Sequence, residues 1–182
     1  MPDPVPVTLD AATSAYLVLD FVSTLCPSSP DCAASLPAIS ALLKKARDAK
    51  VTVVYTVTSQ PGATIVPQIA AQQGETVLTP IASGPDKFKS TKLEDIIKPK
   101  GIKFLVISGN SGNGAAMYTA MGSTLGGYQA VAAVDTMPTS TPFEKFYAEY
   151  QMLHEPTSTN NTDNKPLGGP VTLSRSDLIT FK

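Results

Sequence analysis

The chain has 182 residues, of which 42% are hydrophobic and 16% charged, and its formal net charge is −1. This composition is typical of a compact globule, and we expect one domain spanning residues 1–182 rather than a disordered chain. Lysine and arginine are scattered among nearly as many acids, which argues against nucleic acid as a partner, and no apolar run is long enough to cross a membrane.

Two kinds of segment alternate along the chain. Strands are predicted at 16–21, 51–57, 75–79, 103–108 and 128–134, most of them continuous apolar runs typical of burial on both faces, and the tail 171–181 offers one more. Helices are predicted at 35–50, 91–98, 115–125 and 141–153, with a poorer helix at 63–73 that Pro67 interrupts. The helix at 141–153 is expected to start from a Thr141 cap, with Pro142 first in the helix and Glu144 third.

This alternation predicts the fold class. It favours an α/β, three-layer Rossmann-like sandwich with a mainly parallel six-stranded sheet and helices on both faces. In such folds a ligand lies beyond the carboxyl ends of the strands. The segments 20–25, 108–116 and 135–138 are therefore expected to surround the functional site.

The order of three motifs adds a resemblance. A strand ends at Asp20, a Lys/Phe loop reads DKFKSTKLEDII, and a strand runs through a glycine turn into an alanine-rich helix in GIKFLVISGNSGNGAAMYTAMGSTLGGYQAVAAVD. This order resembles the isochorismatase-like hydrolase superfamily, which includes isochorismatases, nicotinamidases and other cysteine amidohydrolases. The resemblance covers residues 16–152 and implies a small-molecule substrate and no cofactor or metal.

The resemblance also implies roles for Asp20 and Ala115. Most hydrolases of the family use an Asp, a Lys and a Cys, and Asp20 matches the Asp that acts as acid/base. The Cys position, six residues beyond Gly109, holds Ala115, whose methyl group cannot attack a carbonyl. Isochorismatases also carry a small residue there, and they hydrolyse a vinyl ether by protonation and water addition. Asp20 would then be a general acid, although an acid at a strand end can also serve as a cap.

The expected lysine is Lys87. In isochorismatases it stands several residues before the Phe of this loop, where this chain has Ala82, whereas Lys87 directly precedes Phe88. Lys87 reaches the same place if the loop is rearranged; otherwise Lys89 or no lysine serves.

The glycine turn is expected to bind the substrate. The family carries a non-proline cis peptide after the glycine, which corresponds here to Asn110–Ser111. The candidate substrate-binding residues are Asn110, Ser111, Gly112, Asn113 and Ala115, with backbone N–H groups near Ser111 and Ala115 suited to a carboxylate or an oxyanion. Asn113 is alternatively a simple helix cap.

Two cysteines, Cys26 and Cys32, lie in CPSSPDC. Two reduced thiols are expected, because the N-terminus lacks the positive segment of a signal peptide and a cytoplasmic location is the default; a short local disulfide and unconventional secretion are the alternatives. Cys26 and Ser111 are weaker candidates for a displaced nucleophile. The proline- and serine-rich loop around Cys26 indicates an irregular surface segment, and the single histidine, His154, is far from Ser111 in sequence.

Three functions follow as hypotheses. The first is an isochorismatase-like hydrolase that acts on a small metabolite by acid catalysis from Asp20, without a covalent cysteine intermediate. The second is a noncatalytic relative that binds a small ligand or a protein partner, and the third is an amidohydrolase with a displaced nucleophile. A homo-oligomer, a dimer or tetramer, is expected because the resemblance places the aromatic helix 141–153 at subunit interfaces.

Overall fold

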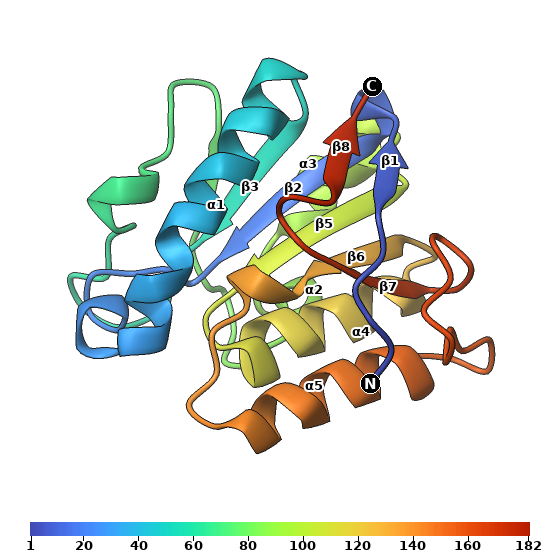
Figure 1. The fold of residues 1–182 in the computed structure, drawn as a ribbon. Helices are drawn as coiled ribbons and strands as arrows, with labels where there is room; N and C mark the ends of the chain where they lie inside the picture. Colours follow the sequence, from blue (N-terminus) through green and yellow to red (C-terminus); the bar gives the residue numbers. More distant parts are fainter.

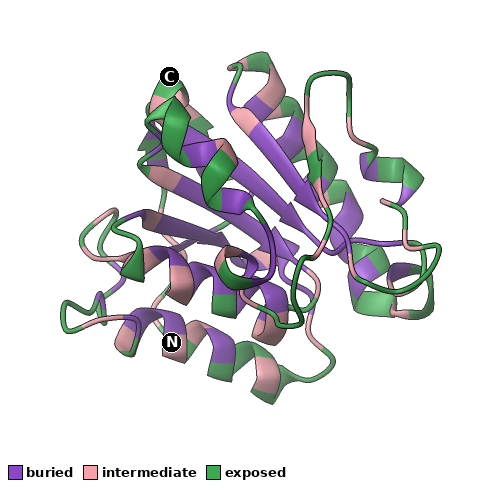
Figure 2. Ribbon diagram, turned by 180° about the vertical axis from the view of Figure 1, so that it is seen from behind, coloured by how far each residue is buried: buried purple, intermediate pink, exposed green.

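The centre of the molecule is a six-stranded sheet. The computed structural model describes all residues, 1–182, and every neighbouring pair of strands in the sheet is parallel. In spatial order the strands are β4 (Thr76–Leu78), β3 (Thr52–Thr56), β2 (Ser14–Leu19), β5 (Phe104–Gly109), β6 (Gln129–Ala133) and β7 (Val171–Ser174). The predicted α/β fold with six strands is confirmed, and the central strands are buried along their length (Figure 2).

Helices cover both faces of this sheet (Figure 1). One face carries α1 (Pro30–Asp48) and a small parallel ribbon of β1 (Val7–Leu9) and β8 (Ile179–Phe181). The other carries α3 (Leu93–Ile97), α4 (Met117–Leu125) and α5 (Pro142–His154). Side chains alternate along β2, so that Leu17 and Leu19 join the core under α3 to α5 while Tyr16 and Val18 join the core under α1.

Four of the predicted helices form, as α1, α3, α4 and α5, but most of their ends differ from those expected. Helix α5 has the predicted capping box, in which the Thr141 hydroxyl accepts from the Glu144 N–H and the Glu144 carboxylate accepts from the Thr141 N–H. Helix α1 begins at Pro30 rather than at 35, because the Ser29 hydroxyl caps it and Pro30 takes the first position, which needs no N–H.

The secondary structure differs from the prediction in three other respects. The helix predicted at 63–73 is wrong: only a short 3-10 turn, Pro67–Ile69, forms there, since Pro67 has no N–H to continue a helix. Helix α4 starts at Met117 instead of 115, after an irregular turn over Gly112–Ala116 in which Gly114 leaves helical φ/ψ. The short helix α2 (Lys87–Ser90) and the strands β1 and β8 were not predicted.

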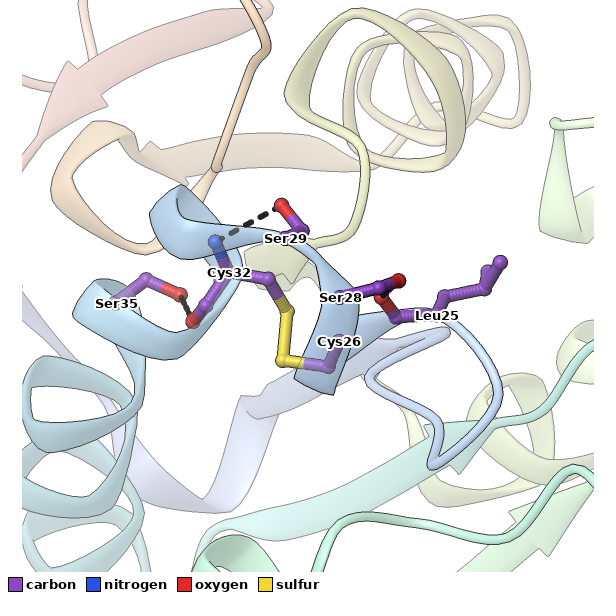
Figure 3. Close-up of a disulfide and its surroundings, with 6 residues drawn as sticks. All are labelled: Leu25, Cys26, Ser28, Ser29, Cys32 and Ser35. Atoms are coloured by element: carbon purple, nitrogen blue, oxygen red, sulfur yellow. Dashed lines mark hydrogen bonds between the residues drawn. A yellow bond between two sulfur atoms is a disulfide. The ribbon is translucent and has the colours of Figure 1, made fainter.

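The expectation of reduced thiols is wrong. Cys26 and Cys32 form a disulfide that joins the 3-10 turn Cys26–Ser28 to the first turn of α1 (Figure 3). Both cysteines are buried, and the chain has no free thiol. The covalent link and the Ser29 cap therefore fix the loop that follows β2 and its reversal into α1.

None of the helices combines the length and the apolar character that crossing a bilayer requires.

The disulfide predicts a labelling result and a stability loss. An alkylating reagent should label no thiol in the unfolded, unreduced protein and two thiols after reduction, as read by mass spectrometry. Replacing both cysteines by alanine should lower the free energy of unfolding by about 2 kcal/mol, because the unfolded chain loses a short covalent loop. Labelling of both thiols before reduction would contradict the bridge.

Candidate functional site

A polar cavity of about 400 Å³ lies at the carboxyl edge of the central strands. Its walls come from the segments that follow β2, β3 and β5, from the loop before α2, and from the approach to α5. The lining residues are Asp20, Leu25, Ser29, Thr58, Gly84, Pro85, Lys87, Asn110, Ser111, Ala115 and Ser140. This is the edge at which α/β sheets bind ligands, and it brings together residues separated by more than a hundred positions in sequence.

Asp20 directly follows β2. Its φ is +59°, a left-handed conformation that aspartate tolerates better than most residues, and its N–H donates to the Thr56 carbonyl of β3. The carboxylate accepts hydrogen bonds at both oxygens, from the Thr56 hydroxyl at 2.6 Å and from the Lys87 ammonium. The backbone reversal at the strand end thus fixes Asp20 at the base of the cavity.

Lys87 supplies the opposite charge. Its Nζ lies 2.5 Å from Asp20 Oδ2, and the side chains of Lys87 and Asp20 are only 4% and 9% exposed. Removing a single charge from water is costly. Here two opposite charges are buried together, and their attraction offsets the hydration that each of them loses. Lys87, rather than Lys89, is therefore the lysine that faces Asp20, since Lys89 is exposed on the outer side of α2.

The start of α2 holds Lys87 in place. The Asp86 carboxylate caps the helix by accepting from the Phe88 N–H, and the Lys87 N–H donates to the Thr119 hydroxyl of α4. Burial raises the pKa of the Asp86 carboxyl. Gly122 of α4 makes this close approach feasible, because a Cβ there would lie 2.5 Å from an Asp86 oxygen.

The glycine turn reaches the cavity with some of its predicted residues. Asn110, Ser111 and Ala115 line it, and the peptide bond Asn110–Ser111 is cis, at the expected position. Gly112 and Asn113 are not among the lining residues: Gly112 is buried, and its N–H donates to the Pro138 carbonyl. The turn therefore presents Asn110, Ser111 and the Ala115 methyl group to the cavity. An attacking thiol would have to take the place of that methyl group.

Neither candidate for a displaced nucleophile has what it needs. Cys26 is held in the buried disulfide and carries no free thiol. Ser111 lines the cavity, but His154 lies at the far end of α5, where its Nδ1 bonds the Tyr150 carbonyl and its ring stacks on Tyr150. A serine without an adjacent base is a weak nucleophile.

Five wall residues escaped the sequence analysis: Ser29, Thr58, Gly84, Pro85 and Ser140. They lie in irregular segments whose paths depend on tertiary contacts. For Thr58 a signal was present, because it follows the end of a buried parallel strand in the same way as Asp20. The predicted segment 135–138 contributes none of the lining residues, and the carboxylate of its Asp135 accepts from the N–H and the hydroxyl of Ser176.

No three His, Cys, Asp or Glu side chains come close enough in the structure to hold a metal ion together.

The buried ion pair predicts a characteristic stability pattern. Lys87→Met should lower the free energy of unfolding by about 3–5 kcal/mol, because it leaves the Asp20 charge buried and unpaired. Adding Asp20→Asn to that variant should restore much of the loss. Urea unfolding checks both, with Lys145→Met as the control, since Lys145 is half-exposed and 4.0 Å from Glu149 and should cost no more than about 0.5 kcal/mol. Additive losses in the double variant would contradict the coupling.

Comparisons with known proteins identify the family of the chain. The model of the isochorismatase domain matches residues 14–160. The search of curated proteins gave no match.

Solved structures share the fold at low sequence identity. A cysteine hydrolase from Pseudomonas syringae pv. phaseolicola 1448A has a TM-score of 0.78 at 14% identity, over 97% of this chain and 95% of that one. An isochorismatase family protein from Desulfovibrio vulgaris subsp. vulgaris str. Hildenborough has 0.74 at 20%, over 91% and 95%. The N-carbamoylsarcosine amidase from Thermoplasma acidophilum has 0.72 at 18%, over 91% and 97%. With a family model that spans most of its length, this chain belongs to the isochorismatase-like hydrolase family.

Proposed function

We propose that the protein hydrolyses a small metabolite by acid catalysis from Asp20, without a covalent cysteine intermediate. One observation carries the proposal: the buried Asp20–Lys87 pair faces a polar cavity whose wall has the Ala115 methyl where a nucleophile would stand. A site of this kind has a proton to give and no activated nucleophile to form an acyl-enzyme.

Vinyl-ether hydrolysis fits these groups. Asp20 passes a proton to the terminal carbon of the enol ether, which becomes an oxocarbenium ion, and the Lys87 ammonium supplies that proton across its hydrogen bond to Asp20. Water adds to the cation and returns a proton to the Asp20–Lys87 pair. The hemiketal or hemiacetal so formed collapses to an alcohol and a carbonyl compound. The net change is addition of one water, and the pair ends as it began.

The surrounding groups support turnover over a purely binding role. The cavity is open enough for a small molecule, and the acid lies on its wall. A noncatalytic relative has no need for two charges that compensate each other's burial at such a cavity.

Activity of the Asp20→Asn variant tests the proposal. The wild type should hydrolyse at least one member of a vinyl-ether panel that includes isochorismate and the neutral ethylene glycol monovinyl ether, with the carbonyl product followed over time. Asp20→Asn should lower kcat at least about a hundredfold, because a general acid contributes about 10²–10⁴-fold. The variant keeps the shape of the side chain but leaves the Lys87 ammonium unpaired, so its Tm is measured first and kcat is compared only at a temperature at which it is folded.

One control makes that result specific. Thiol alkylation of the unreduced protein should leave vinyl-ether hydrolysis unchanged, since the native chain has no free thiol that could take part. Absence of turnover with every member of the panel, or equal turnover by Asp20→Asn, would contradict the proposed function and favour a binding protein.

We also propose that the protein self-associates through α5. Phe143, Phe146, Tyr147 and Tyr150 are each at least 41% exposed, and two of the ring pairs, Phe143–Tyr147 and Phe146–Tyr150, stack along the helix. A row of exposed aromatic rings on one helix is unusual on a monomer and typical of an interface core.

Sedimentation velocity tests the self-association. The wild type should sediment as a dimer or tetramer, and Phe143→Glu with Phe146→Glu should sediment as a monomer, because charge on the ring row opposes its burial. Val77→Glu, on the β4 edge of the sheet, is the matched control and should not change the mass. A monomeric wild type would overturn this assignment.

The cytoplasmic location expected from the sequence stays a prediction. The disulfide is an observation against it, because such bonds persist mainly in oxidising compartments.

A further inference from the structure

One polar atom in the cavity wall has no partner. The Thr58 Oγ1 is the single buried side-chain nitrogen or oxygen in the structure that makes no hydrogen bond. Thr58 lines the same cavity as Asp20 and Lys87, just beyond the end of β3. Leaving a buried hydroxyl unpaired is costly, and native proteins do so rarely, so an unpaired hydroxyl at a cavity calls for a partner that the cavity could hold.

The other lining groups limit what that ligand can be. The ionisable side chains of the wall are Asp20 and Lys87, and they neutralise each other. No aromatic side chain lines the cavity, so there is no ring on which a flat substrate could stack. Hydroxyls and an amide provide the remaining polar contacts, from Ser29, Ser111, Ser140 and Asn110.

We propose that Thr58 is a substrate-binding residue, and that the cavity selects a small, aliphatic, uncharged substrate whose hydroxyl or ether oxygen pairs with the Thr58 hydroxyl. The inference rests on the proposed function in that it assigns the substrate class of the same site. A dianion such as isochorismate would need a cation to spare, whereas the one ammonium in the wall is already paired with Asp20.

Two vinyl ethers separate the classes. Ethylene glycol monovinyl ether carries a neutral hydroxyl beside the reacting bond, and isochorismate carries two carboxylates. For each compound, the kcat/KM per vinyl group is divided by the rate of hydrolysis of that compound in dilute acid. The resulting value for the wild type should be at least about tenfold higher with the neutral ether than with isochorismate. An equal or higher relative value for isochorismate would overturn the assignment of an uncharged substrate.

Substitution of Thr58 tests the residue itself. Thr58→Val keeps the shape and removes the hydroxyl, so the KM for the neutral ether should rise about tenfold while kcat changes little. Thr58→Ser keeps the hydroxyl and should restore a KM close to the wild-type value. The ligand-free Thr58→Val protein should melt at the same temperature as the wild type or higher, because it loses an unpaired buried hydroxyl.

A binding measurement keeps this inference separate from catalysis. Ethylene glycol itself, used as a probe at millimolar to molar concentration, should raise the Tm of the wild type and of Asp20→Asn but not that of Thr58→Val. If the proposed function fails and no ether is hydrolysed, this shift still supports the Thr58 assignment. Equal Tm shifts in wild type and Thr58→Val, or an unchanged KM, would show that the hydroxyl serves no ligand.

Discussion

Two opposite charges buried against each other at the end of β2 are the constraint on which the rest of the site depends. Asp20 and Lys87 come from segments 67 residues apart, and each is nearly inaccessible to solvent. Neither charge would be tolerated in that position alone, so the strand end, the cap of α2 and the packing of α2 on α4 must all form together. That arrangement requires a left-handed backbone at Asp20 and a residue without a side chain at position 122.

The walls of the cavity above the pair are held by two different kinds of bond. Backbone hydrogen bonds hold the wall that the glycine turn forms. One of them is donated by the Gly112 N–H to the Pro138 carbonyl. The wall from Leu25 and Ser29 flanks Cys26 and is held by the disulfide and the cap of α1 (Figure 3). A covalently fixed wall suits a site that must keep a small molecule in one orientation while a proton moves. It also implies that redox conditions bear on the shape of the cavity.

The sequence was sufficient for the fold and for placing Asp20 at the ligand edge of the sheet. Continuous apolar strands alternating with amphipathic helices indicate a parallel sheet, and the acid at the end of the first of these strands belongs at the ligand edge. The lysine was ambiguous, because its place depends on how the loop before α2 folds, and only the Asp86 cap and the Thr119 contact select Lys87 over Lys89. Ser29 could not be assigned to the site, since its segment has no periodicity, whereas Thr58 follows the end of a buried strand as Asp20 does and was overlooked. The disulfide was underestimated because a proline-rich CPSSPDC segment looks like an exposed loop, whereas Ser29 and Pro30 in fact start a helix inside it.

If the proposed function is correct, Asp20 delivers a proton to carbon in the slow step, with no thiol involved. Turnover of ethylene glycol monovinyl ether in D₂O compared with H₂O, over the full pH profile, is the most direct test. We expect a lower kcat in D₂O at the plateau and one deuterium in the methyl group of the acetaldehyde produced. Equal plateau rates in the two solvents, with turnover that is abolished by thiol alkylation, would contradict it.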